Sequence, residues 1–167
     1  MTPPPWWHDD ASLCYVVLEQ ARIACETLLE ETGERRERDV LEVARSSLGL
    51  GGYIVSDGLD PDLRAALLEL VRCHGHAPVP PATGELERIC LLTLHGRALA
   101  ARGARRPVQT LTMELVHRHT RHALGALEKL LGPRRVAALT RDARAGGYFD
   151  EAWQRECLAP LPASWAA

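Results

Sequence analysis

The densest group of side chains capable of chemistry lies between residues 114 and 122, where the chain reads Glu-Leu-Val-His-Arg-His-Thr-Arg-His. On a helical wheel, His119 and His122 fall on the apolar side, together with Leu115 and Ala126. Two imidazoles one turn apart that face a core can bind a metal or haem, or act as acid and base. With Cys90 they form a candidate small-molecule pocket. The alternative is a pair of core histidines that hydrogen-bond to backbone carbonyls or water.

Other candidate metal and catalytic patterns are incomplete. Cys73 and His76 belong to the run Cys-His-Gly-His, and thiolate and imidazole are ligands that suit zinc, but no second pair completes a four-ligand site. The chain has no nucleophile-elbow motif, no phosphate-binding glycine loop, no zinc-protease motif and no dinucleotide fingerprint. The sequence therefore favours a protein that is not an enzyme and that holds no cofactor or metal.

Charge is segregated along the chain. Residues 1–83 contain 7 Arg and 14 Asp or Glu, residues 84–145 contain 12 Lys or Arg and 5 Asp or Glu, and the whole chain has a net charge of −2. Segregation of this kind predicts an acidic partner for the basic half, or pairing between the halves through Glu30, Glu31, Glu34 and Glu37. The arginines that we expect to bind a carboxylate or phosphate are Arg102, Arg105, Arg106, Arg118, Arg121, Arg134 and Arg135.

The elements that position these residues are helices. Apolar residues recur at helical spacing throughout, and no period-2 alternation competes, so we predict an all-α, single-domain bundle of five to six helices. Asp60-Pro61 marks one helix start, and the glycines between 49 and 52 are expected to kink the second helix or end it early. The predicted order is an arm at 1–10, a bundle at 11–158 with a linker at 77–84, and a tail at 159–167. We expect the main helices at about 10–32, 34 to the mid-fifties, 61–73, 85–101, 107–131 and 133–145, and a short last helix at 149–158.

Composition indicates a cytoplasmic protein. Five cysteines at irregular spacing, in a chain of 167 residues, are typical of free thiols in a reducing compartment. No run of apolar residues is long enough for a membrane span, and residues 1–10 lack the features of a secretory signal.

Two stretches resemble the small all-helical subunit of type III CRISPR effector complexes. The run Leu-Gly-Gly-Tyr-Ile-Val-Ser-Asp-Gly-Leu at 50–59 resembles an apolar helix of that family that ends in Asn-Gly-Leu, although this chain has Asp57 in place of the Asn. The run Thr-Arg-His-Ala-Leu-Gly-Ala-Leu at 120–127 resembles the family's last helix. The resemblance implies that Arg121 faces RNA-bound neighbours, and this chain continues past the point where that family normally ends.

The leading functional prediction is a non-catalytic helical interaction protein, such as an adaptor, accessory or regulatory subunit. It would dock by its basic face, chiefly Arg118 and Arg121, onto an acidic protein partner. Tryptophans near both ends of the chain are a second feature typical of binding surfaces. One alternative is a small helical subunit that contacts a nucleic-acid backbone within a larger complex. The other is a small-molecule or metal-binding protein or enzyme that uses His119 and His122.

Overall fold

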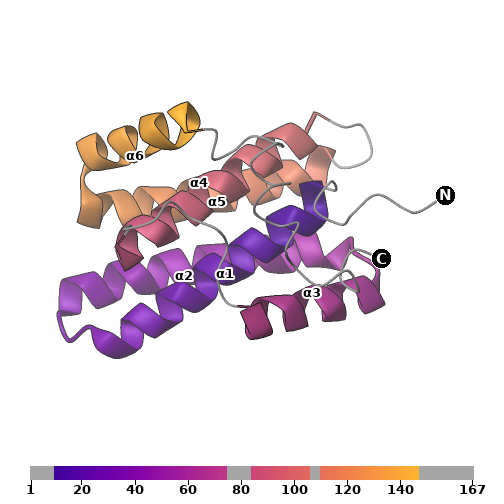
Figure 1. Cartoon of the computed structure of the whole chain (residues 1–167), viewed down its shortest axis with the longest axis horizontal. Coiled ribbons are helices and arrows are strands. Elements are labelled where there is room, and N and C mark those ends of the chain that lie inside the picture. The colour runs from indigo at the N-terminus through magenta and orange to yellow at the C-terminus, as the bar shows by residue number, and fades with distance from the viewer. Residues whose placement is uncertain (1–9, 75–83, 106–109, 147–167) are drawn as a thin grey trace.

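The computed structural model describes residues 10–74, 84–105 and 110–146, which form six α-helices and no strand (Figure 1). The all-α prediction is therefore confirmed. The predicted arm, tail and helix at 149–158 lie outside the described residues, as does nearly all of the predicted linker. The helices are α1 (Asp10–Glu31), α2 (Arg35–Asp57), α3 (Pro61–His74), α4 (Glu85–Gly103), α5 (Thr110–Leu131) and α6 (Pro133–Ala145).

Four of the helices form an antiparallel bundle. α1 packs against α2 and α4, and α5 packs against the same two helices, so the order around the bundle is α1, α2, α5, α4. The cross-contacts show that neighbours run in opposite directions. Arg102 near the end of α4 bonds to Asp10 at the start of α1, and Arg36 near the start of α2 donates to the carbonyl of Lys129 near the end of α5. α3 packs on α1, and α6 packs on α4 and α5.

The core is built largely from leucine, because the chain has only one Phe. Burial of these side chains is the main force that holds the helices together, at about 1.5–3 kcal/mol for each fully buried leucine. α4 is buried on more than one side, since nearly every residue from Arg88 to Gly96 is inaccessible to solvent. The largest fully buried side chains are Leu13, Leu18, Leu41, Leu48, Leu67, Ile89, Leu92, Leu99, Met113 and Leu127.

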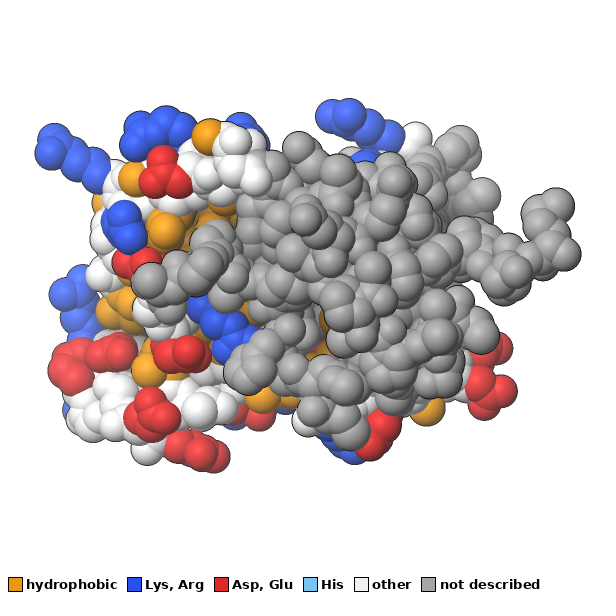
Figure 2. Space-filling model, in the orientation of Figure 1, with side chains coloured by type: hydrophobic (Ala, Val, Ile, Leu, Met, Phe, Trp, Pro, Cys, Tyr) orange, Lys and Arg blue, Asp and Glu red, His pale blue; other side chains and the backbone are white. Residues whose placement is uncertain are grey.

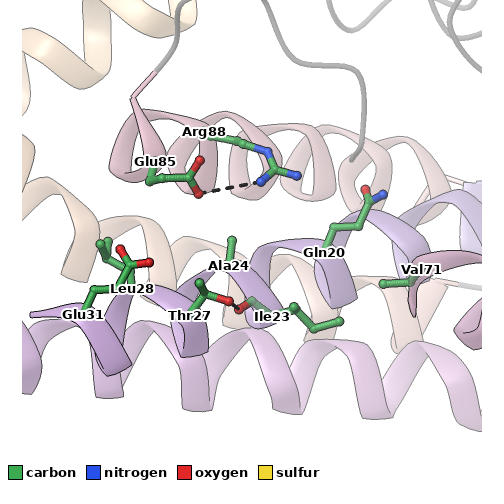
Figure 3. A pocket seen from close by; sticks show the side chains of 9 residues that line it. All are labelled: Gln20, Ile23, Ala24, Thr27, Leu28, Glu31, Val71, Glu85 and Arg88. Carbon is green, nitrogen blue, oxygen red and sulfur yellow. Dashed lines mark hydrogen bonds and ion pairs between the residues drawn. The ribbon is translucent and has the colours of Figure 1, made fainter. Parts of the chain in front are cut away.

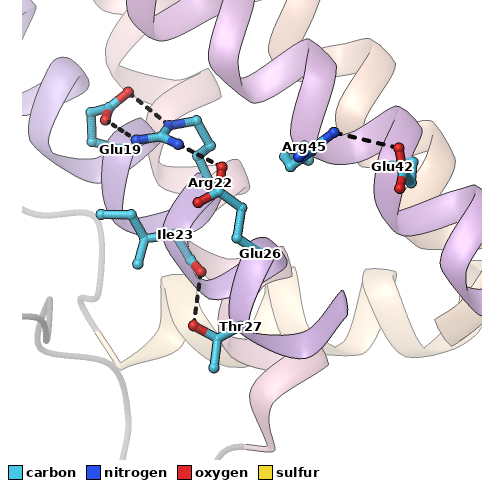
Figure 4. A network of polar contacts seen from close by, with 7 residues as sticks. All are labelled: Glu19, Arg22, Ile23, Glu26, Thr27, Glu42 and Arg45. Carbon is cyan, nitrogen blue, oxygen red and sulfur yellow. Dashed lines mark hydrogen bonds and ion pairs between the residues drawn. The ribbon is translucent and has the colours of Figure 1, made fainter. Parts of the chain in front are cut away.

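The glycine-rich segment of α2 is a site of close helix packing. It does not end α2 early, because the helix continues to Asp57. A Cβ at Gly52 would lie 3.0 Å from Glu19 Oε1, and one at Gly49 would lie 3.5 Å from Arg22 Cδ. Glu19 is bound by Arg22, which also bonds to Glu26, and Figure 4 shows this cluster on α1. The glycines thus leave room on α2 for a polar cluster of α1 in which Glu19 is buried and Arg22 is half-buried.

Side chains and glycine define several helix ends. Asp60 caps α3 as predicted, since its Oδ2 accepts from the backbone N–H groups of Asp62 and Leu63 at 3.0 and 3.1 Å. The two carboxylate oxygens of Glu34 accept from the backbone at the start of α2. Gly132 has φ of 86°, a left-handed conformation that turns the chain between α5 and α6 and that favours glycine.

Candidate interaction surface

The buried face of α5 differs from the predicted one. Met113, Val116, Thr120, Ala123 and Leu127 point into the core. The many Leu and Ala residues of α5 form two apolar stripes on its helical wheel, and the predicted stripe is the one nearer α2. The shift matters for the candidate residues. Leu115 is 41% exposed, His122 is exposed and His119 is only partly buried.

A groove runs along the outer side of the seam between α2 and α5. It has a volume of about 380 Å³. Its α5 side carries three cations and an imidazole at helical spacing, so they project from the same side of the helix. The lining residues are Val43 of α2 and Arg118, Arg121, His122, Gly125, Ala126 and Lys129 of α5.

Large apolar side chains gather on the same two helices. Within the part of the chain that the structure describes, every exposed large hydrophobic side chain belongs to α2 or α5. Because α2 and α5 are antiparallel, Leu50 lies at about the level of Leu115, and Val43 lies at about the level of His122. We use the term α2–α5 face for the exposed apolar residues Val43, Leu50, Tyr53, Leu111 and Leu115 together with the basic residues Arg118, Arg121 and Lys129.

The part of the chain that the structure describes does not neutralise the cations of the α2–α5 face. Among the described residues, the side chains of Arg118, Arg121 and Lys129 form no ion pair. The pKa of the neighbouring His117 is lowered, first by burial and then by the positive charges of Arg97 and Arg121. The face therefore combines an apolar part with cations available to a partner.

The other predicted arginines have different environments. Arg102 bonds to the buried carboxylate of Asp10 at 2.9 Å through Nε and at 2.6 Å through Nη2. Arg135 makes two bonds to Glu87 Oε1, at 3.0 and 2.8 Å. Arg105 and Arg134 are exposed but do not line the groove, and Arg106 lies outside the described residues. Of the arginines that were expected to bind a carboxylate or phosphate, Arg118 and Arg121 lie on the α2–α5 face.

Pairing between the acidic and basic halves is sparse. None of the predicted partners Glu30, Glu31, Glu34 and Glu37 forms an ion pair with a described residue. Glu34 instead caps α2. On the side of the molecule shown in Figure 2, basic side chains (blue) gather over α6 and acidic side chains (red) gather over the hairpin of α1 and α2.

The structure does not support the pocket of His119, His122 and Cys90. His119 lies beside Gly51 of α2, on the flank of α5 away from α4, whereas Cys90 is fully buried on α4. Burial raises the pKa of the Cys90 thiol to about 12, as is typical of a cysteine packed in the core.

The structure does not describe the side chains of the predicted zinc ligands. His76 and the side chain of Cys73 lie outside the described residues. Within those residues, no group of three or more His, Cys, Asp or Glu side chains could hold a metal ion.

His95 and Gln20 are buried polar residues that are not among the predicted site residues. His95 is 2% exposed, and its pKa is lowered to about 3 by burial and by the nearby charge of Arg102. Gln20 of α1 is 8% exposed. The signal for His95 is its place in the nearly continuous apolar run of α4, which is typical of a helix buried on several sides.

Comparison with known proteins adds no assignment: no protein-family model, curated protein or solved structure matches this chain. Among the described helices, none is long and apolar enough to cross a membrane.

Proposed function

We propose that this chain is a non-catalytic interaction protein whose α2–α5 face docks an acidic, amphipathic helix of a protein partner. The observation that carries the proposal is that all exposed large hydrophobic side chains of the described residues lie on α2 and α5, beside cations without ion pairs. Contiguous exposed apolar surface bordered by polar residues is typical of a protein interaction site. A partner helix would place apolar side chains against Leu50 and Leu115 and carboxylates against Arg118 and Arg121.

The arrangement of the bundle supports this choice of face. α3 has its main packing contact on α1, and α6 covers α4 and α5. Within the described residues, neither helix covers the groove on the seam of α2 and α5. A partner helix along that seam would pack on α2 and α5, as α3 packs on α1 and α6 packs on α4 and α5.

The mixture of side chains favours a protein over a nucleic acid. A surface that binds a phosphate backbone relies on Lys and Arg and shows strong salt dependence. Here exposed Leu, Val and Tyr side chains accompany the cations, and apolar side chains gain little from contact with phosphates. The Arg residues supply recognition of carboxylates, because a guanidinium binds a carboxylate through two parallel hydrogen bonds.

The test measures binding of three fluorescent probes by anisotropy. One is a helical peptide with Leu on one face and Glu on the other, the second has Lys in place of Glu, and the third is a single-stranded oligonucleotide. We expect the Glu peptide to bind best. The double variant Arg118→Glu/Arg121→Glu should weaken its binding at least tenfold, and Leu111→Ser/Leu115→Ser should weaken it similarly without loss of folding, since both leucines are exposed.

The matched control is Arg134→Glu/Arg141→Glu on α6, where both arginines are exposed and do not line the groove. This control makes the same change in net charge and should retain Glu-peptide binding. Preferred binding of the oligonucleotide, with a steep loss in salt, would replace the proposal with the nucleic-acid alternative. Equal effects of the two charge reversals would show that net charge and not the α2–α5 face decides binding.

A further inference from the structure

A groove of about 760 Å³ lies between α4, α5 and α6. Its volume is within the range for small-molecule pockets, about 300–1,000 Å³. Leu94 of α4, Leu124 of α5 and Val136 of α6 form an apolar floor, and each of these residues is only 7–8% exposed. Ala98 and Ala137 also line the groove, and their short side chains leave room above this floor.

The smaller hollow shown in Figure 3, about 400 Å³ between α1, α3 and α4, differs from this groove in its charges. The basic residue that borders the hollow, Arg88, forms an ion pair with Glu85, which the dashed line marks. The groove between α4, α5 and α6 instead presents cations that a ligand can bind.

Two arginines that line the groove, Arg97 of α4 and Arg144 of α6, have no anionic partner among the described residues. Arg97 donates from Nε to Nε2 of His117 at 3.4 Å. An imidazole accepts such a bond in its neutral form, so the positive charge of Arg97 is not compensated. The Nη groups of Arg97 and the exposed guanidinium of Arg144 are therefore available to an anion.

Both arginines lie toward the same end of the groove. α6 runs in the same direction as α4 (Figure 1), and Arg135 near the start of α6 bonds to Glu87 near the start of α4. From that bond, Arg144 and Arg97 each lie about 14–15 Å farther along their helices, at a rise of about 1.5 Å per residue. The two guanidinium groups thus approach one level of the groove from opposite walls.

The opposite end of the groove carries an acid. Glu128 near the end of α5 lines the groove together with Pro133 at the start of α6. Glu128 is half-buried and forms no ion pair with a described residue. Along α5 it lies about 16 Å from His117, which marks the level of Arg97. The groove is therefore basic at one end, apolar along its floor and acidic at the other end.

We propose that this groove binds an aliphatic monocarboxylate, with its carboxylate at Arg97 and Arg144 and its alkyl chain along the apolar floor. A guanidinium binds a carboxylate through two parallel hydrogen bonds, and the floor favours a saturated chain. Glu128 at the far end disfavours a second anionic group, because like charges repel. The extended length of decanoate is close to the length of the groove. This site is separate from the α2–α5 face and does not depend on the proposed function.

The test uses an NMR titration of the ¹⁵N-labelled full chain with three probes of equal chain length. Decanoate has a carboxylate at one end, decanol has none and decanedioate has one at each end. We expect decanoate to produce saturable shifts of backbone amides at 94–101 and 133–144, with each of the other probes at least tenfold weaker. Decanol lacks the anion for Arg97, and decanedioate brings its second carboxylate to Glu128. No saturable shift, shifts centred on the α2–α5 face, or equal affinity for all three probes would overturn the proposal.

Variants at the two ends of the groove sharpen the test. The double variant Arg97→Met/Arg144→Met should weaken decanoate binding at least tenfold. The matched change Arg134→Met/Arg141→Met, at exposed arginines of α6 that do not line the groove, should not. Glu128→Gln should strengthen decanedioate binding severalfold with little effect on decanoate. Equal losses in the two double variants, or unchanged decanedioate binding in Glu128→Gln, would contradict the assignment, and the three probes on the unaltered chain decide the matter if a variant does not fold.

Discussion

Individual polar residues in the core of this protein are kept in one charge state by their surroundings. His95 is buried beside Arg102, and both burial and the positive charge lower its pKa to about 3. The same Arg102 binds the buried carboxylate of Asp10, so it serves the fold and not the docking surface. Arginine at the boundary of the core thus has a structural role that its position in a basic sequence segment does not reveal.

His95 makes stability depend on pH. In the unfolded chain a histidine has its ordinary pKa of about 6.5, so between about pH 6.5 and 3 the unfolded state binds a proton that the folded state does not. Stability is therefore lost as pH falls through this window, at up to about 1.4 kcal/mol per pH unit from this one group. His95→Gln should reduce the slope of unfolding free energy against pH by as much as that amount, as measured by urea denaturation from pH 7 to 4.5. The same change at the exposed His122 is the matched control, and an equal slope in His95→Gln and the unaltered chain would contradict the assignment.

At the scale of the helices, glycine sets how closely two elements approach. Gly96 of α4 faces Leu18 of α1, and a Cβ at this position would lie 2.7 Å from Leu18 Cδ2. Leu18 is fully buried, so it has little room to move. Gly125 of α5 is also inside a helix, but nothing lies within 4 Å of the position that its Cβ would occupy.

The two glycines should therefore respond in opposite ways to alanine. Gly96→Ala should lower the free energy of unfolding by about 1–3 kcal/mol, because Leu18 or the helix backbone must shift. Gly125→Ala should raise it by about 0.5–1 kcal/mol, because alanine favours the helix and meets no obstruction. Urea denaturation of both variants measures these differences, and a stabilising Gly96→Ala would show that α1 and α4 are less tightly packed than the structure indicates.

At the scale of the whole molecule, the segregated charge of the sequence persists at the surface. The ion pair of Asp10 and Arg102 links the acidic and basic halves, whereas the other ion pairs of the described residues lie within one half. The extensive apolar core is the main source of stability. Exposed charges are thus available for association and contribute little to folding.

Salt should therefore affect binding more than folding. Between low and high ionic strength, the free energy of unfolding should change by less than about 1 kcal/mol, because exposed ion pairs are individually weak. Over the same range, binding of the Glu peptide should weaken severalfold, since Arg118, Arg121 and Lys129 meet its charges at an exposed surface. Urea denaturation and anisotropy at matched salt concentrations make the comparison. A large loss of stability together with unchanged binding would reverse the assignment of these charges.

The sequence by itself determined the helical class and most helix limits, because apolar spacing, Asp60-Pro61 and Gly132-Pro133 act over short distances along the chain. It also drew attention to Arg118 and Arg121 on α5. Tertiary structure alone decided which neighbours those residues meet. A helical wheel with two apolar stripes does not say which one faces the core, so Leu115 and His122 were placed inside and are exposed. The partners of Arg102, the groove between α4, α5 and α6 and the gathering of apolar residues on α2 and α5 depend on segments that only packing brings together.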